Sequence, residues 1–327
     1  MAAPARLQLA LAPTPLLRLD RVSRRLGVEL FVKRDDLTGL LESGSKVRKL
    51  EFLVGEALQQ GADTLITCGP PQSNGCRAVA AVAARLGLRA VLALSGVRPA
   101  SYDGDLLLGR LLGAEVHYCG DAAAPDLDAR AERLAVEVRA RAGRPYVIPE
   151  SGANEVGALG YLECAVELME QMHHGAPRFD TVVISAVTGG SQAGMLMGKQ
   201  LAGMPGEIVG VPTTRPAETV RRHIRSTIEA AVRRFGFAIE VPKTIHLLDS
   251  EGGLDQDLEL VVRLAREEGL LLDPIYAARG FRALVETVAR DPKVLGRRIC
   301  FVHTGGPFGV FPLRERLSGL IDRSAQQ

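Results

Sequence analysis

The chain has 327 residues, 46% of them hydrophobic, which is enough to bury the core of one large domain or of two ordinary ones. Its formal net charge is +2 and its 40 basic residues are spread along the chain, so neither a nucleic-acid nor an anionic-membrane partner is expected. Five cysteines without CxxC spacing favour free thiols over a disulfide framework or a zinc site, and we therefore expect a cytoplasmic protein.

Short apolar runs alternate with longer amphipathic segments along the whole chain. The apolar runs predict strands at residues 29–33, 64–68, 90–94, 115–118, 146–149, 181–186, 207–211, 245–248 and 299–303. Apolar residues at helical spacing predict helices between them, most clearly at residues 46–60, 77–87 and 127–143. Near-continuous apolar strands that alternate with helices are typical of an α/β fold with mainly parallel sheets.

The first candidate site is the segment from Ser43 to Lys49, where a small, flexible turn leads directly into a predicted helix. A helix N-terminus favours anions, and Lys46 and Lys49 share one helical face because they are three residues apart. A solvated basic first turn is the alternative interpretation. The helix dipole mildly disfavours lysines at that end, which weakens this alternative.

Three more loops with small or polar residues follow predicted strands, at residues 69–75, 187–194 and 301–306. In the first loop, Ser73 or Asn74 could serve simply as a helix N-cap. The second loop resembles a phosphate cradle but lacks both a P-loop lysine and GxGxxG spacing, which indicates one phosphate and no dinucleotide. In the third loop, we expect His303 to be a packed histidine. Together with a lysine at a helix start, these loops match the needs of a lysine-bound, phosphate-bearing cofactor.

Several motifs in one order make the sequence recognisable nearly from end to end. They include Val32-Lys-Arg-Asp-Asp-Leu-Thr-Gly, Lys46-Val-Arg-Lys-Leu-Glu-Phe-Leu, Gln72-Ser-Asn, Gly157-Ala-Leu-Gly-Tyr, Val187-Thr-Gly, Asp273-Pro-Ile-Tyr and His303-Thr-Gly-Gly. With these motifs the chain resembles the D-cysteine desulfhydrase and 1-aminocyclopropane-1-carboxylate (ACC) deaminase family. Members of that family are fold type II enzymes that use pyridoxal 5'-phosphate (PLP).

The resemblance implies a tryptophan-synthase-β-like architecture. Two doubly wound α/β domains with mainly parallel sheets would hold PLP between them. Residues 1–47 and 154–327 would form the large PLP-binding domain, and residues 48–153 would form a smaller inserted domain. A homodimer and a small amino-acid substrate are implied as well, with no metal, nucleic-acid or membrane partner.

The resemblance also implies roles for individual residues. Lys46 would hold PLP as a Schiff base and move the Cα proton of the substrate. Ser73, facing the substrate, and Tyr276, near the pyridine ring, would complete the catalytic set. Further contacts to the cofactor would come from Lys49, Asn74, Val187, Thr188, Gly189, Gly190, Ser191 and Thr304.

The sequence departs from the family pattern at positions that would set substrate specificity. Gly75 stands where a bulky polar residue is usual, and Ala277 stands where ACC deaminases carry an acid. A second active-site tyrosine is expected within residues 247–253, but none is present, and Glu251 is its nearest counterpart. Thr304 could hydrogen-bond the pyridine nitrogen where ACC deaminases carry leucine. A neutral partner at that nitrogen favours elimination over ACC ring opening.

The predicted function is therefore a PLP-dependent lyase that performs α,β-elimination and deamination of a small amino acid. D-Cysteine would yield pyruvate, sulfide and ammonia, although the altered pocket positions also allow a divergent substrate. The alternatives are an ACC deaminase-like enzyme, a β-replacement enzyme and a catalytically silent PLP-binding protein. The presence of Lys46, Lys49 and Ser73 argues against a silent protein.

Overall fold

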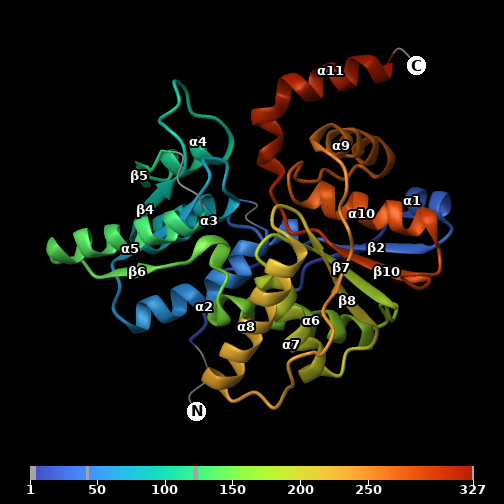
Figure 1. Ribbon diagram of the computed structural model, residues 1–327, viewed down its shortest axis with the longest axis horizontal. Helices are drawn as coiled ribbons and strands as arrows, with labels where there is room; N and C mark the ends of the chain where they lie inside the picture. Colours follow the sequence, from blue (N-terminus) through green and yellow to red (C-terminus); the bar gives the residue numbers. More distant parts are fainter. Residues whose placement is uncertain (1–4, 42–43, 121–123, 326–327) are drawn as a thin grey trace.

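Two twisted sheets organise the computed structural model, which describes residues 5–41, 44–120 and 124–325 (Figure 1). The larger sheet has the strand order β1-β2-β10-β7-β8-β9, and the smaller sheet has the order β5-β4-β3-β6. The strands of the larger sheet are β1 (Leu16–Arg18), β2 (Glu29–Lys33), β7 (Thr181–Ala186), β8 (Glu207–Pro212), β9 (His246–Leu247) and β10 (Arg298–Val302). Those of the smaller sheet are β3 (Thr64–Gly69), β4 (Arg89–Leu94), β5 (Glu115–Tyr118) and β6 (Pro145–Val147).

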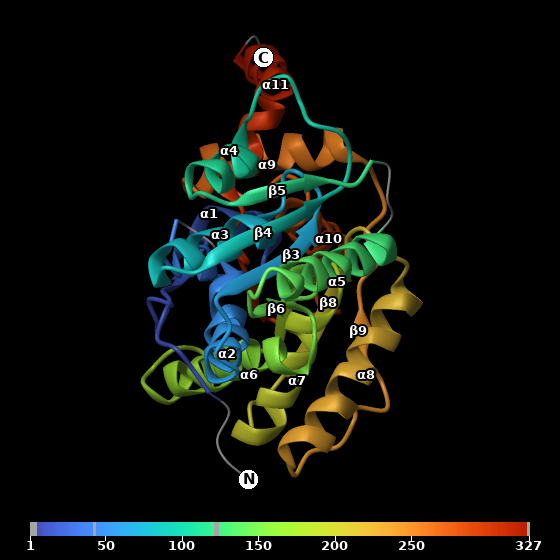
Figure 2. The same cartoon turned by 90° about the vertical axis from the view of Figure 1, so that its left-hand side faces the viewer.

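Helices cover both faces of each sheet, as Figure 2 shows for the smaller sheet, with α5 on the face away from α3. The α-helices are α1 (Asp20–Leu26), α2 (Ser45–Gln59), α3 (Asn74–Leu86), α4 (Gly104–Leu111), α5 (Ala124–Ala140), α6 (Glu155–His173), α7 (Gly190–Ala202), α8 (Ala217–Phe235), α9 (Leu254–Glu268), α10 (Ala277–Arg290) and α11 (Arg314–Ala325). Three 3₁₀ turns are η1 (Asp35–Leu37), η2 (Glu150–Gly152) and η3 (Pro307–Leu313). Among the described helices, none has the length and apolar character of a membrane-spanning segment.

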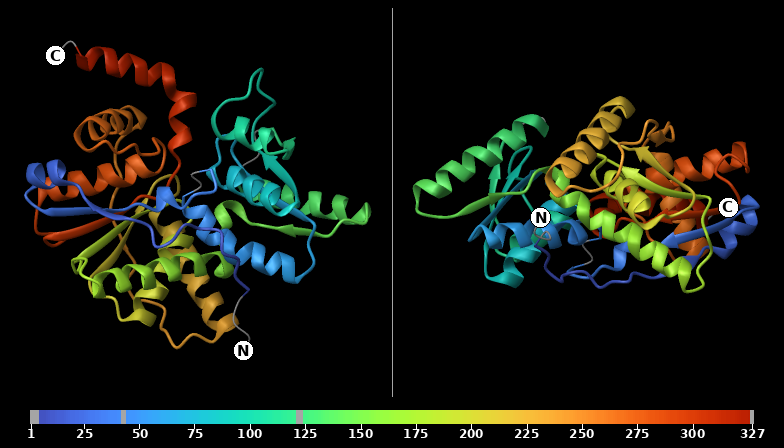
Figure 3. Two further views of the ribbon diagram at one scale, coloured as in Figure 1. Left: turned by 180° about the vertical axis from the view of Figure 1, so that it is seen from behind. Right: turned by 90° about the horizontal axis from the view of Figure 1, so that it is seen from below.

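The predicted α/β fold with mainly parallel sheets is confirmed. All nine predicted strands form, each within about two residues of its expected bounds, and every pairing among them is parallel. β1 was not predicted, because three residues are too few to show a period. It pairs antiparallel with β2 at the sheet edge. Near the other end of the chain, β10 lies beside β2, so both ends of the chain contribute to one sheet (Figure 3).

The first turns of α2 are anchored by a buried network of charged side chains. The Arg48 guanidinium donates to the Asp35 carboxylate at 2.8 Å and to the Glu167 carboxylate at 2.9 Å. Lys33 pairs with Glu167 from the end of β2. Burial alone would raise the pKa of Asp35, but the positive charge of Arg48 brings it below its usual value. The network fixes the start of α2 against both β2 and α6.

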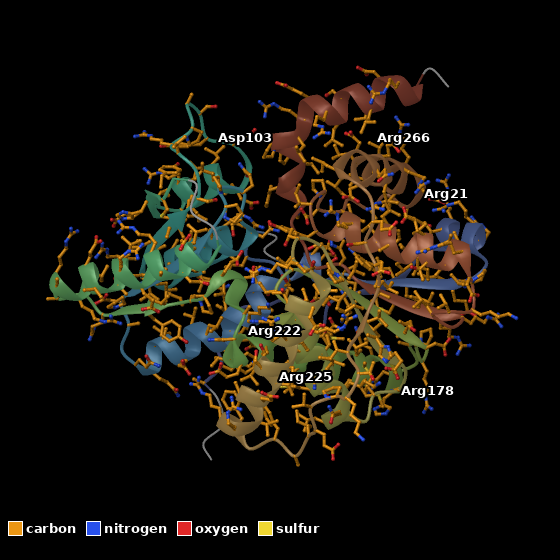
Figure 4. All side chains as sticks on the ribbon, in the orientation of Figure 1. Arg21, Asp103, Arg178, Arg222, Arg225 and Arg266 are labelled. Atoms are coloured by element: carbon orange, nitrogen blue, oxygen red, sulfur yellow. The ribbon has the colours of Figure 1, made fainter. Side chains whose placement is uncertain are left out.

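The segment from 48 to 153 contains all four strands of the smaller sheet. The expected boundary at 47/48 falls inside α2, whose apolar residues join a core shared with α6 and α7. A second link between the two parts of the chain involves Asp103, which is labelled in Figure 4. Its side chain caps α4 and accepts a charged hydrogen bond from Arg314 at the start of α11. The domain boundaries therefore stay a prediction.

Candidate active site

The candidate active site is a pocket between the two sheets. The loops that follow β3 and β6 of the smaller sheet and β7 and β10 of the larger sheet all reach it. The carboxyl ends of parallel strands are where α/β sheets place ligands. The first turn of α2 and the start of α10 complete the walls, and the volume is about 710 Å³ with the space open to solvent included.

Lys46 projects into this pocket from the first turn of α2. The helix begins after Gly44, which has a φ of +61°, and the backbone N–H of Ser45 donates to the Thr304 carbonyl at 2.9 Å. A Cβ at position 44 would lie 2.2 Å from that carbonyl oxygen, so only glycine fits the turn. The preceding residue of the predicted motif, Ser43, lies outside the described residues.

The Lys46 amine is held in a state that favours loss of its proton. Burial lowers its pKa, while the negative charges of Glu150 and Asp273 oppose that shift. Among the described residues, its one hydrogen bond is a weak contact of 3.5 Å with the Ser45 hydroxyl. An amine of this kind can act as a nucleophile or as a base, which a fully solvated lysine does poorly at neutral pH.

Lys49, one turn further along α2, is a buried amine without an anionic partner among the described residues. Its side chain donates to the Ser151 carbonyl at 3.2 Å and forms no ion pair with any described residue. Burial, reinforced by the charge of Lys46, lowers its pKa well below the usual value. The N-terminus of α7 lies beside it, because a Cβ on Gly190 would be 3.4 Å from the Lys49 amine. A bound phosphate would supply the missing charge.

The predicted phosphate loop follows β7 and opens α7. The side of the pocket next to Lys49 is lined by Val187, Thr188, Gly189 and Ser191. No side chain caps α7, so the backbone N–H groups of its first turn remain available to an anion. These residues and Lys49 together fit the phosphate of PLP. Gly190 belongs to the same turn but does not line the pocket.

Ser73, Asn74 and Gly75 approach the pocket from the smaller sheet. The Ser73 hydroxyl caps α3 by accepting a hydrogen bond from the Cys76 N–H at 3.2 Å, and Ser73 also lines the pocket. Ser73 is therefore both the N-cap of α3 and a residue of the pocket wall. Asn74 and Gly75 line the same wall.

The start of α10 forms the opposite wall with the loop after β10. Tyr276 and Thr304 both line the pocket. Burial raises the pKa of the Tyr276 phenol further above its usual value, and the Asp273 charge adds to that shift. The phenol is therefore a hydrogen-bond donor at neutral pH. His303, next to Thr304, is packed as expected, with Nε2 at 2.9 Å from the Leu271 carbonyl oxygen.

Two predicted specificity residues do not face the pocket. Ala277 is fully buried in α10, and its N–H donates to the Asp273 carboxylate. Glu251 is exposed in the connection between β9 and α9. Neither residue is part of the pocket wall. The roles of Ala277 and Glu251 in substrate specificity therefore stay predictions.

Three ionisable residues at or beside the pocket were missed from the sequence. Asp273 and Glu150 line it, and Arg215, which follows β8, pairs with Glu150. Burial raises the pKa of Asp273 to about 6, although three backbone N–H groups lower it. Glu150 directly follows a predicted strand, so the rule that identified the other loops could have found it. No described group of His, Cys, Asp and Glu side chains could hold a metal ion.

The sequence profile of the family described as "pyridoxal-phosphate dependent enzyme" matches residues 7–305. A buried lysine pair between two parallel sheets, with a helix N-terminus beside it, is the kind of site that such an enzyme requires. The chain belongs to this family of PLP-dependent enzymes.

Two relatives and one solved structure are similar to this chain over most of its length. The chain is 38% identical to a D-cysteine desulfhydrase of Yersinia pestis over 94% of this chain and 95% of the relative. It is 36% identical to a provisionally named ACC deaminase of Pyrococcus abyssi, over 94% of this chain and 93% of that one. A crystal structure described as an ACC deaminase homologue superposes with a TM-score of 0.89 at 33% identity, covering 97% of this chain and 96% of the other.

Proposed function

We propose that the protein is a PLP-dependent lyase that removes the β-substituent and the amino group of a small amino acid, with D-cysteine as its model substrate. The observation that carries this proposal is the pair Lys46 and Lys49. Both are buried amines with a lowered pKa in the same pocket, and Lys49 lies beside a helix N-terminus without an ion pair to any described residue. The similarity to a D-cysteine desulfhydrase over 94% of the chain supports the choice of substrate.

Lys46 is the proposed anchor of PLP and the proposed base for the Cα proton. When the cofactor is bound, its ring supplies the electron sink that stabilises negative charge at Cα. The lowered pKa leaves the Lys46 amine able to accept the proton and to return it to the leaving group or to solvent. Lys49, Val187, Thr188, Gly189, Gly190 and Ser191 are the proposed phosphate ligands.

Ser73 and the N-terminus of α3 are the proposed site for the α-carboxylate of the substrate. A helix N-terminus and a hydroxyl favour an anion at this position. Asn74 would contact the cofactor, and Tyr276 would pack near the ring and substrate. Thr304 would face the pyridine nitrogen.

The residues proposed to lie near the pyridine ring of PLP favour elimination over ACC ring opening. Thr304 lines the pocket, whereas Ala277 neither lines it nor carries an acid. A neutral hydroxyl partner keeps the pyridine nitrogen less protonated than a carboxylate would. That suits the departure of a good β-leaving group better than cleavage of a carbon–carbon bond.

We also propose that residues 48–153 form the smaller domain and that the protein is a cytoplasmic homodimer. The placement of all four strands of one sheet between residues 64 and 147 supports the domain division. The five free cysteines support a reducing compartment. The homodimer rests on the family resemblance alone.

The visible absorption spectrum of the PLP-loaded protein tests the proposal. The lysine-bound cofactor should give a band that shifts when D-cysteine is added, with sulfide and pyruvate released. Lys46→Ala should lose both the band and the turnover, while Lys199→Ala, at an exposed ion pair with Glu207, should keep them. A wild-type protein without a band after PLP addition would overturn the cofactor site. A band that ignores D-cysteine, L-cysteine and ACC would overturn the substrate assignment.

A further inference from the structure

A glutamate carboxylate forms part of the pocket wall and is held there from the opposite sheet. Glu150 begins η2, directly after β6 of the smaller sheet, and its side chain is 19% exposed. One of its oxygens, Oε2, accepts a charged hydrogen bond from Arg215, which lies between β8 and α8 of the larger part. Glu150 lines the pocket, whereas its partner Arg215 is not among the lining residues.

The backbone around Glu150 is fixed, which gives the carboxylate a defined position. The Glu150 N–H donates to the Asp128 side chain at 3.3 Å, and the next carbonyl, that of Ser151, accepts from the Lys49 amine. Ser151 has a φ of +60°, a left-handed conformation that turns the chain sharply at this point. The glutamate is therefore tied to the same lysine that would bind the cofactor phosphate.

The second carboxylate oxygen is available to a ligand. Oε1 of Glu150 makes no hydrogen bond or ion pair with any residue that the structure describes. The negative charge of Glu150 acts on both reacting groups. It opposes the lowering of the Lys46 pKa by burial, and it adds to the raising of the Tyr276 pKa by burial and by Asp273. Glu150, Lys46 and Tyr276 line the same pocket, so the carboxylate adds negative charge to the space in which the substrate would react.

Gly75 leaves space beside Ser73, Lys46 and the residue that follows Glu150. An added Cβ at position 75 would lie 3.5 Å from the Ser73 hydroxyl, 3.7 Å from the Ser151 Cα and 3.8 Å from the Lys46 Cε. The space is therefore bounded by the proposed carboxylate site, by the lysine and by the residue next to Glu150. A group that extends from the Cβ of the substrate into this space approaches η2.

We propose that Glu150 selects substrates whose β-substituent is an uncharged or cationic hydrogen-bond donor, such as a hydroxyl, thiol, carboxamide or ammonium group. This inference rests on the proposed function, since it specifies the substrate class of the same pocket. An ionised carboxylate only accepts hydrogen bonds. It therefore binds a donor group favourably and repels a sulfonate, phosphate or carboxylate. Arg215 moderates the selection by neutralising part of the charge.

Asparagine and aspartate test the proposal as a matched pair of ligands. They share one shape and differ at the β-substituent, which is a neutral donor in one and an anion in the other. Binding of each enantiomer to the PLP-loaded protein is followed through the shift of the cofactor absorption band, which requires no turnover. The wild-type protein should bind asparagine about tenfold more tightly than aspartate, or better, and 2,3-diaminopropionate should bind at least as tightly as asparagine.

Two variants separate selection from a structural role. Glu150→Gln should bring the ratio of the two dissociation constants close to one. Arg215→Gln, which leaves the carboxylate without its counter-charge, should increase the preference for 2,3-diaminopropionate. Arg234→Gln is the matched control, because it breaks ion pairs with Glu56 and Glu155 outside the pocket and should leave the ratio unchanged. Equal weakening of all three ligands by Glu150→Gln would overturn the proposal.

The binding ratio also distinguishes this inference from the proposed function. A wild-type protein that discriminates as expected, yet releases no 2-oxo acid from any substrate, would refute the lyase and keep the selection by Glu150. A protein that converts D-cysteine but binds asparagine and aspartate equally would keep the lyase and refute the selection.

Discussion

The backbone N–H of Ser45 donates a 2.9 Å hydrogen bond to the carbonyl of Thr304. This bond ties the residue before the proposed Schiff-base lysine to the residue that would face the pyridine nitrogen. The two positions are distant in sequence and come from different elements, the start of α2 and the end of β10. Lys46 would bind the aldehyde carbon of the cofactor and Thr304 would contact its ring nitrogen. The main-chain hydrogen bond would fix the separation of these two residues.

Gly44→Ala should disrupt this connection. The added methyl would meet the Thr304 carbonyl at 2.2 Å, and the φ of +61° is unfavourable for alanine. We expect a loss of about 2–4 kcal/mol in the free energy of unfolding, measured by urea denaturation. Gly87→Ala is the control, since it shares the positive φ but has nothing within 4 Å, and it should cost about 1 kcal/mol. Equal losses in the two variants would contradict the close approach.

Lys49→Gln should weaken the binding of PLP but not of pyridoxal, which lacks the phosphate. The variant removes the amine beside the N-terminus of α7, which a bound phosphate would hold in its protonated form. A charged hydrogen bond to phosphate contributes about 1.5–3 kcal/mol. We expect the dissociation constant for PLP to rise about 10- to 100-fold in reconstitution titrations. The dissociation constant for pyridoxal should stay within about threefold of the wild-type value. A parallel rise for both ligands would mean that Lys49 does not bind the phosphate.

The sequence predicted the strands well because buried parallel strands are short apolar runs bounded by turns. The loops that follow β3, β7 and β10 were found for the same reason, since ligands bind where such strands end. The ion pair of Glu150 with Arg215 could not be predicted from the sequence. It joins residues that are 65 positions apart and that follow strands of different sheets. The sequence of the connection after β9 also could not show that Glu251 is exposed to solvent. Loop direction depends on tertiary packing, which no local pattern encodes.

Arg48→Met should be strongly destabilising. It would leave the Asp35 and Glu167 carboxylates buried without the guanidinium that neutralises them. Breaking one partner of a buried ion pair costs about 3–5 kcal/mol, because an uncompensated charge stays behind. We expect a loss of this size in urea denaturation, and a smaller added loss when Asp35→Asn is combined with it. Full additivity of the two substitutions would show that the residues do not interact.

Asp273 should make the stability of the cofactor-free protein fall between pH 4 and pH 7. Burial raises its pKa to about 6, whereas an unfolded aspartate has a pKa of about 3.9. The folded protein therefore holds this proton more tightly, and the resulting stabilisation is complete below about pH 4 and is lost as the pH rises through about 6. A shift of about two pH units corresponds to about 3 kcal/mol.

Asp273→Asn isolates this contribution, because asparagine does not titrate and keeps an oxygen that can accept from the N–H groups at the start of α10. The free energy of unfolding is measured by urea denaturation of both proteins across the pH range. The wild-type value minus the variant value should decrease by about 2 kcal/mol from pH 4 to pH 7, because part of the full contribution of about 3 kcal/mol is already lost at pH 4. Titrating groups that do not interact with Asp273 cancel in the difference. A difference that stays flat or grows would show that the Asp273 carboxyl is not held in its protonated form by the fold.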